Sequence, residues 1–323
     1  MFTLAELEAA LPIVRAAVPP TPQFAWPLLR QHTGIDVVVK HENHTPTGAF
    51  KVRGGLVYVD RLKRERPHVQ GVVTATRGNH GQSLAFACAR AGLPCVVVVP
   101  FGNSTEKNAA MRAFGAELIE HGRDFDEARE RAAEIARERG YESGPSFAKD
   151  LVLGVATYAY ELFTAEPQLD AVFVPIGLGS GICGMIGARD ALGAKAQVFG
   201  VVSDRANTYK RSLDAGRPVP TNSAATFADG MAVRVPSEDA LAIMRRGMAG
   251  LIEVTDDEIA EAIRILYTST HTLAEGAGAA ALAALLRERA RLSGKRAAVI
   301  VSGQNIDRPW MATVLGGGTP KVD

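Results

Sequence analysis

Short runs of apolar residues, rich in valine and too short for helices, recur along the chain with longer periodic segments between them. The runs span 71–74, 96–99, 171–174, 198–202 and 297–301, and such runs are typical of strands buried in a parallel sheet. The periodic segments predict helices over 82–91, 105–114, 125–139, 151–163, 256–267 and 276–291. This alternation predicts the α/β class, with open, twisted, mostly parallel sheets flanked by helices.

Three further segments have local signals. Thr3 and Glu6 have the spacing of a helix capping box. The segment 171–188 carries no charge, but its proline and glycines disfavour a membrane span and favour a strand, a glycine loop and a small-residue helix. The proline-containing stretches 18–27 and 217–221 are expected to be surface loops.

The charge balance then narrows the function classes. The chain has 323 residues, and its 36 Lys and Arg residues nearly cancel its 35 Asp and Glu residues. Nucleic-acid and membrane-surface binders usually carry a basic excess, so a small neutral or zwitterionic ligand fits better. Cys88, Cys95 and Cys183 lack the spacing of a disulfide framework or a zinc site. With no targeting signal at the N-terminus, we expect a cytoplasmic protein.

The candidate chemistry follows from where the predicted strands end. Ligands of open parallel sheets bind at the carboxyl ends of the strands. Three predicted strands run directly into glycine-rich or polar segments, at 74–82, 175–181 and 302–305, and a fourth segment, 40–55, stands out by its composition. We therefore expect the functional residues in these four segments.

Taken one at a time, these segments leave two interpretations open. Glycines alternate over 177–181, which lets backbone N–H groups converge on a phosphate, but a tight strand-to-helix turn needs the same residues. Lys51 lies among small residues, where a lysine with a lowered pKa forms Schiff bases, but it also fits a solvated helix start. Asn79 and Ser302 fit helix caps equally well. His41, His44 and His80 have neither triad nor metal spacing and are expected to be loop or pocket residues.

The combination of segments is more specific than any one of them. Lys40, Glu42, Asn43, Thr47, Gly48, Ala49, Phe50, Lys51, Arg53 and Gly54 match a K-x-E-N…T-G-[SA]-F-K-x-R-G pattern. G-N-H-G-Q stands at 78–82, G-L-G-S-G at 177–181, A-D-G-M-A-V at 228–233, E-G-A-G-A at 275–279 and S-G-Q-N at 302–305. Over almost its whole length the chain resembles the fold-type II pyridoxal-phosphate enzymes, in particular the threonine/serine dehydratase branch. The phenylserine dehydratases are included in this resemblance.

The resemblance implies a role for each matching residue. Lys51 would hold pyridoxal 5'-phosphate as a Schiff base and then remove the α-proton of the substrate. Further cofactor contacts would come from Phe50, Asn79, Gly177, Leu178, Gly179, Ser180, Gly181, Glu275 and Ser302. Thr76, Arg77, Gly78 and His80 would receive the substrate. Ser302, as a neutral partner of the ring nitrogen, would favour β-elimination over transamination.

The resemblance also implies an organisation of the molecule. Residues 1–45 plus 148–323 would form a large cofactor-binding domain, residues 46–147 a small domain, and the protein would be a homodimer. Because the chain ends soon after Ser302, we expect no C-terminal regulatory domain, and therefore a catabolic or specialised role.

Departures from the family pattern bear on the substrate. Arg77 stands where serine or alanine is common, which disfavours racemisation. Its guanidinium fits a substrate carboxylate and fits a surface ion pair equally well. Val202 and Ser203 replace the glutamate of metal-binding relatives, so no metal is expected. Phe24 and Trp26 are either core anchors or the lining of an aromatic pocket.

The expected reaction converts a β-hydroxy-α-amino acid, such as threonine or serine, to a 2-oxo acid and ammonia. 3-Phenylserine and 3-hydroxyaspartate are further substrate candidates. A β-replacement synthase and a non-catalytic ligand-binding protein are the alternatives.

Overall fold

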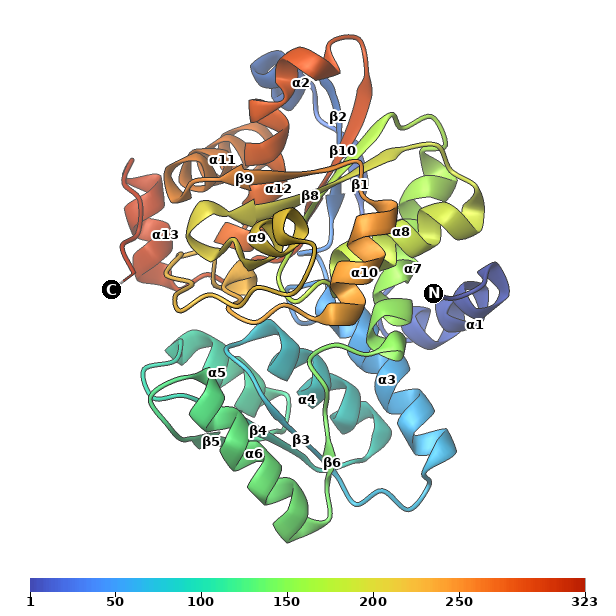
Figure 1. Cartoon of the computed structure of the whole chain (residues 1–323), viewed down its shortest axis with the longest axis vertical. Coiled ribbons are helices and arrows are strands. Elements are labelled where there is room, and N and C mark those ends of the chain that lie inside the picture. The colour runs from blue at the N-terminus through green and yellow to red at the C-terminus, as the bar shows by residue number, and fades with distance from the viewer. Residues whose placement is uncertain (323) are drawn as a thin grey trace.

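The computed structural model describes residues 1–322 and contains two sheets (Figure 1). The larger sheet has the strand order β1 (Gln23–Ala25), β2 (Asp36–His41), β10 (Arg296–Val301), β7 (Ala171–Pro175), β8 (Gln197–Ser203) and β9 (Gly250–Val254). The smaller sheet has the order β5 (Glu117–Glu120), β4 (Cys95–Val99), β3 (Val72–Ala75) and β6 (Glu142–Ser143). Neighbouring strands are parallel except β1 and β2. The predicted α/β class with mostly parallel sheets is confirmed.

Helices cover both sheets, and all six helices predicted from the periodic segments are present. The helices are α1 (Leu4–Arg15), α2 (Pro27–Thr33), α3 (Lys51–Glu65), α4 (Asn79–Ala91), α5 (Thr105–Ala113), α6 (Phe125–Arg139), α7 (Lys149–Ala165), α8 (Ser180–Leu192), α9 (Thr208–Ala215), α10 (Glu238–Gly247), α11 (Asp256–Thr270), α12 (Gly276–Arg287) and α13 (Arg308–Leu315). Short 3-10 turns lie at Asp204–Ala206, Asp229–Met231 and Arg289–Leu292. The helix predicted over 276–291 therefore ends earlier, and its last residues form a 3-10 turn.

The local predictions had mixed outcomes. The capping box at the start of α1 is present, with both reciprocal bonds between Thr3 and Glu6. The segment 171–188 is β7, a glycine loop and the first part of α8, as expected, and no helix within residues 1–322 is long and apolar enough to span a membrane. The prediction of a surface loop over 18–27 is wrong at Gln23–Ala25, because these residues form β1, which pairs antiparallel with β2. Three residues are too few for a recognisable alternation.

No apolar pattern predicted α3, because Gly54 and Gly55 in its first turns disfavour a helix. Their packing explains them. A Cβ at position 54 would lie 2.7 Å from the Leu151 carbonyl oxygen, and one at position 55 would lie 2.8 Å from that of Ser83. Tight packing of α3 against α4 and α7 therefore requires glycine here.

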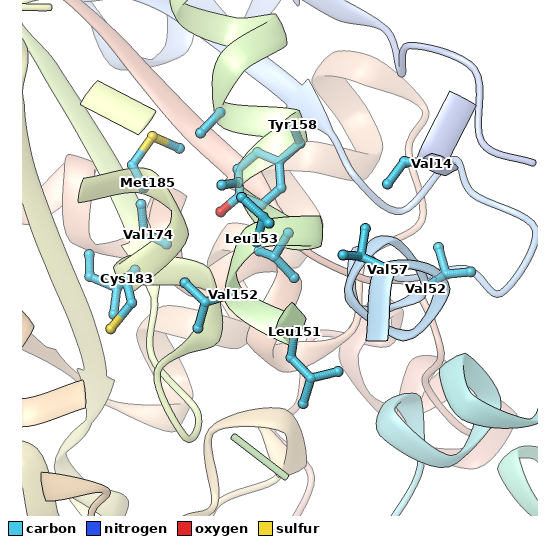
Figure 2. Close-up of a cluster of buried hydrophobic side chains, with 14 of the residues drawn as sticks. Val14, Val52, Val57, Leu151, Val152, Leu153, Tyr158, Val174, Cys183 and Met185 are labelled. Atoms are coloured by element: carbon cyan, nitrogen blue, oxygen red, sulfur yellow. The ribbon is translucent and has the colours of Figure 1, made fainter. Parts of the chain in front are cut away.

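The core between the layers is built around α7. Figure 2 shows α7 side chains with α3 on one side and α8 on the other. The labelled residues are Val14, Val52, Val57, Leu151, Val152, Leu153, Tyr158, Val174, Cys183 and Met185. This apolar cluster continues to Val97 and Val99 in the smaller sheet. The three cysteines are buried and unpaired, consistent with core positions.

A buried charge network, called the Arg53 cluster below, fixes the chain on either side of Lys51. Its members are Lys40, Glu42, Arg53 and Glu161, and their side chains are at most 5% exposed. The cluster connects β2, α3 and α7.

The strands of the smaller sheet all lie between Val72 and Ser143, inside the predicted small domain. The domain limits at 45/46 and 147/148 stay a prediction.

Candidate active site

The residues that follow β10 hold the segment that carries Lys51. The Phe50 N–H donates to the Ser302 carbonyl oxygen (3.0 Å), and the Gln304 N–H donates to the Gly48 carbonyl oxygen (2.9 Å). Lys51 is the first residue of α3. These two backbone bonds place it beside Ser302, although the two residues lie at opposite ends of the sequence.

The glycine loop between β7 and α8 is shaped by close packing. A Cβ at Gly177 would lie 2.3 Å from the Gly230 carbonyl oxygen, and Gly179 has a φ of +113°. The Tyr209 hydroxyl donates to the Leu178 carbonyl oxygen (2.7 Å) and so fixes the position of the loop. The first N–H groups of a helix have no partner within it. The start of α8 is therefore a suitable place for a phosphate.

A narrow cleft joins these segments. Its lining consists of Phe50, Lys51, Asn79, Pro175, Gly177, Leu178, Gly179, Ser180, Gly181, Gly230, Met231, Glu275, Ala277 and Ser302. Every residue for which the resemblance implied a cofactor contact belongs to this set. The structure thus brings those residues together, and their individual roles stay a prediction.

Lys51 is half-buried in this cleft. Its Nζ lies 5.0 Å from the centre of the Phe50 ring. Burial lowers the pKa of Lys51, and the nearby Glu275 carboxylate opposes this effect. A lowered pKa increases the share of neutral amine, which is the form that attacks a carbonyl carbon or accepts a proton.

Asn79 is held from two sides at the start of α4. Its Nδ2 donates to Glu275 Oε1 (2.7 Å), and its Oδ1 accepts from Asn305 Nδ2 (2.8 Å). An amide nitrogen has two N–H groups, so one remains for a ligand. Burial raises the pKa of Glu275 to about 7, since the positive charge of Lys107 offsets it only in part.

Of the four predicted substrate-binding residues, Thr76, Arg77 and Gly78 lie in the loop between β3 and α4, and His80 is in the first turn of α4; all four are outside the lining of the cleft. The Gly78 N–H donates to Thr76 Oγ1 (3.0 Å), so this donor is used within the loop. Arg77 is exposed. The structure does not bring these residues into the narrow cleft, and substrate binding by them stays a prediction.

His80 follows Asn79 at the start of α4. Its Nε2 is buried and has no hydrogen-bond partner within residues 1–322. Burial, together with the charge of Lys51, lowers the pKa of His80 to about 3, and a bond to the Pro145 carbonyl opposes this. The ring is therefore neutral at physiological pH.

Phe24, Trp26, His41 and His44 form an aromatic group at the β1 edge of the larger sheet. Trp26 Nε1 donates to His41 Nε2 (3.1 Å), and the rings of His41 and His44 stack with centres 5.1 Å apart. Phe24 is 52% exposed, so it is not a core anchor. The group is separate from the lining of the cleft.

The side chains that could bind a metal ion are dispersed. Within residues 1–322, no group of three or more His, Cys, Asp or Glu side chains is arranged to hold such an ion.

Two residues near the cleft were not among the predicted site residues. Lys107 on α5 pairs with Asp229 and lies 3.7 Å from Glu275 Oε2. Asp229 was noted only as part of the 228–233 pattern. No sequence signal identified Lys107, because one lysine in a helix is ordinarily a solvated side chain.

The chemistry of the cleft fits pyridoxal phosphate. A helix start with tightly packed glycines suits the phosphate, and Lys51 offers a half-buried amine. Asn79 has a free amide N–H, and Ser302 lines the same cleft. One cleft thus offers a partner for each polar group of that cofactor.

Comparison with protein families gives a match over most of the chain. A family model described as pyridoxal-phosphate dependent enzyme matches residues 14–303.

Two curated relatives are similar to the chain. The biosynthetic L-threonine dehydratase IlvA of Escherichia coli (strain K12) is 34% identical over 274 residues, which cover 84% of this chain and 53% of the relative. The chain thus spans about half the length of that protein. The L-threo-3-hydroxyaspartate ammonia-lyase of Saccharomyces cerevisiae is 30% identical over 305 residues, which cover 94% of this chain and 93% of the relative.

A solved structure has the same fold. The processed form of threonine deaminase isoform 2 from Solanum lycopersicum superposes with a TM-score of 0.89 at 28% sequence identity. The match covers 98% of this chain and 94% of the tomato chain.

Proposed function

The chain belongs to the family of pyridoxal-phosphate dependent enzymes, and from this premise we propose that it is an ammonia-lyase acting on a β-hydroxy-α-amino acid. It eliminates the β-hydroxyl group and yields a 2-oxo acid and ammonia. The observation that carries this proposal is the meeting of Lys51, Asn79, Ser302 and the start of α8 in one cleft. Relatives with threonine dehydratase and 3-hydroxyaspartate ammonia-lyase activity support the reaction class.

When bound, pyridoxal phosphate supplies an electron-accepting ring that stabilises negative charge at the substrate Cα. The start of α8 would hold its phosphate, and Asn79 would donate to its 3-oxygen. Ser302 would offer the ring nitrogen a hydroxyl group that carries no charge. The protein therefore adds no fixed negative charge at the ring nitrogen, a setting that favours elimination.

Lys51 acts as the base. Its amine, with a lowered pKa, takes the proton from the substrate Cα, and the electron pair of that bond forms the Cα–Cβ double bond. The Cβ–O bond breaks, and the hydroxyl group leaves as water with the proton that Lys51 took from Cα, which returns Lys51 to its neutral form. The released enamine becomes an imine, and one water molecule hydrolyses it to a 2-oxo acid and ammonia. The water released in the elimination balances the water consumed in the hydrolysis, so the amino acid is converted to the 2-oxo acid and ammonia alone.

The substrate is threonine or serine in this proposal, with 3-hydroxyaspartate as a second candidate. Arg77 favours the second candidate, since it is exposed two residues before Asn79 and offers a guanidinium to a second carboxylate. The similarity to the yeast 3-hydroxyaspartate enzyme over nearly its full length agrees with this.

Purified protein incubated with pyridoxal phosphate tests the proposal. L-Threonine, L-serine, L-threo-3-hydroxyaspartate and threo-3-phenylserine are supplied separately, and 2-oxo acid and ammonia are measured. We expect equal amounts of the two products from at least one substrate, and none with Lys51→Ala. Absence of product from all four substrates would refute the ammonia-lyase proposal.

We further propose that the protein is a cytoplasmic homodimer with its domain boundaries near residues 45 and 147. Family resemblance supports the dimer, and three buried, unpaired cysteines agree with a reducing compartment. Light scattering after gel filtration measures the mass directly. A mass near that of one 34.3 kDa chain would contradict the dimer.

A further inference from the structure

Lys107 is a buried lysine on α5, in the layer of the smaller sheet, whose side chain extends toward Glu275 in the lining of the cofactor cleft. Only 5% of the residue is exposed. Its ammonium pairs with Asp229 and lies 3.7 Å from Glu275 Oε2. Both carboxylates belong to the layers of the larger sheet. A buried lysine ordinarily requires such partners, but two acidic partners exceed what one cation neutralises.

The stem of Lys107 also contacts the loop predicted to bind the substrate. A Cβ at Gly78 would lie 2.5 Å from Lys107 Cδ, so Gly78 makes room for the stem. This contact directs the ammonium past the start of α4 toward Glu275. The position of Lys107 is thus fixed at both its stem and its end.

The positive charge of Lys107 acts on the cleft through Glu275, which lines it. Its Oε1 accepts from Asn79, while its Oε2 has no hydrogen-bond partner within residues 1–322. An ionised carboxylate accepts strongly, whereas a protonated one is itself a donor. The charge on Glu275 therefore decides how firmly the Asn79 amide is held with its second N–H toward the cleft.

We propose that Lys107 is a positioning residue of the cofactor cleft: its ammonium favours the ionised form of Glu275 against burial and the Asp229 carboxylate, and the Glu275 carboxylate in turn orients Asn79. This proposal rests on the proposed function only in taking the cleft as the cofactor site. Lys107 acts through Glu275 and Asn79, and not by touching the reacting atoms.

The charged groups that face Glu275 make this role necessary. Lys107 on α5 and Lys51 on α3 favour its ionised form, whereas Asp229 disfavours it. Asp307 in turn faces Lys107. In the proposed function the Lys51 amine either bonds to the cofactor or exchanges a proton with the substrate, so Lys107 is the cation that continues to face Glu275. Without it, burial alone would favour the protonated carboxyl.

The test measures the ionisation of Glu275 directly. Full-length protein labelled with ¹³C at the glutamate carboxyl carbons is titrated by NMR, with and without pyridoxal phosphate. The Glu275 resonance is the one missing in Glu275→Gln. In Lys107→Met we expect its midpoint to rise by about 1–3 pH units, the usual effect of removing a nearby opposite charge.

Two further variants separate a charge effect from loosened structure. Asp229→Asn removes the competing anion, so the midpoint should fall, opposite to Lys107→Met. Lys107→Arg keeps the charge and should restore the wild-type midpoint. Lys149→Met is the matched control, because Lys149 pairs with Glu6 at the surface and its side chain is 55% exposed.

An unchanged or lower midpoint in Lys107→Met would overturn the proposal, as would shifts in the same direction for Lys107→Met and Asp229→Asn. Should Lys107→Met not fold, a failure of Asp229→Asn to lower the midpoint would also overturn it. The titration without cofactor does not depend on ammonia-lyase activity. If the midpoints shift as expected but the protein forms no 2-oxo acid, the ammonia-lyase proposal is refuted and the role of Lys107 is supported.

Discussion

Two charge clusters lie near the candidate active site, and they differ in how completely their charges are matched. In the Arg53 cluster, Arg53 and Lys40 face Glu42 and Glu161, and all four carboxylate oxygens accept hydrogen bonds. The second, called the Glu275 cluster, has Lys107 facing Asp229 and Glu275. There one carboxylate oxygen, Glu275 Oε2, is unbonded within residues 1–322.

The pKa directions follow this difference. Burial acts to raise the pKa of Glu161, but Arg53 and Lys40 outweigh it, and the pKa is lowered. At Glu275 the pKa rises to about 7, because burial outweighs the attraction of Lys107. Removing one partner from a set of matched buried charges is costly, whereas an incompletely matched carboxyl next to a cleft can respond to a ligand.

The largest effect is expected from breaking the matched cluster. Arg53→Met leaves Glu42 and Glu161 buried without their main partner. Such a loss costs about 3–5 kcal/mol, measured as the free energy of unfolding in urea.

Arg61→Met is the control for that loss. The Arg61–Asp150 pair is about one-quarter exposed, and we expect its removal to cost roughly 0–1 kcal/mol. Similar losses in the two variants would show that the Arg53 cluster is no more important to stability than a partly exposed pair.

In the Glu275 cluster we expect a substitution to increase the free energy of unfolding instead of decreasing it. The pKa of Glu275 is raised above its ordinary value of 4.5, so the folded state favours the protonated form. Its cost to stability appears as pH rises from about 4.5 and is complete above about 7. Glu275→Gln should therefore stabilise the protein by about 1–3 kcal/mol at pH 8.5, and much less at pH 5. A destabilised variant at pH 8.5 would contradict the comparison.

A buried histidine, His41, makes stability decrease as pH falls, whereas Glu275 makes it decrease as pH rises. Burial, together with nearby positive charge, lowers the pKa of His41 from 6.5 to about 4. The unfolded chain then binds a proton that the folded protein does not, and stability decreases as pH falls from about 6.5 to about 4. His41→Gln should flatten this acid slope and leave the Glu275 effect on the alkaline side unchanged. An unchanged acid slope in thermal unfolding between pH 4 and 7 would refute this.

Arg77 should have the smallest effect on stability. Since it is exposed, Arg77→Ser is expected to change the free energy of unfolding by less than about 0.5 kcal/mol. If Arg77 binds a second substrate carboxylate, kcat/KM for 3-hydroxyaspartate should fall about tenfold or more, with threonine little affected. Equal losses for both substrates would remove Arg77 as the basis for the second candidate substrate.

The part of the site that the sequence predicted consists of local signals. The loop 177–181 and the segment around Lys51 are contiguous, and each has a residue type that its chemistry requires. Lys107 was not predicted, because its importance depends on Asp229, which lies 122 positions away along the chain. Charge pairing across two sheets leaves no trace in local spacing.

The same distinction applies to the fold. Valine-rich runs predicted β3, β4, β7, β8 and β10, whose buried faces dictate such sequences, but they did not predict β2, although it has a valine run and lies inside the larger sheet. The edge strand β1 and the glycine-containing helix α3 were not predicted. Both form through contacts with distant segments, β1 with β2 and α3 with α4 and α7, and these contacts override weak local preferences.

The central claim is that Lys51 holds the cofactor and serves as the base. It is tested most directly by reducing the protein with borohydride in the presence of pyridoxal phosphate and mapping the modified peptide by mass spectrometry. The account predicts one stoichiometric pyridoxyl group, attached to Lys51 and absent in Lys51→Ala. A stoichiometric modification of a different lysine, or none, would contradict it.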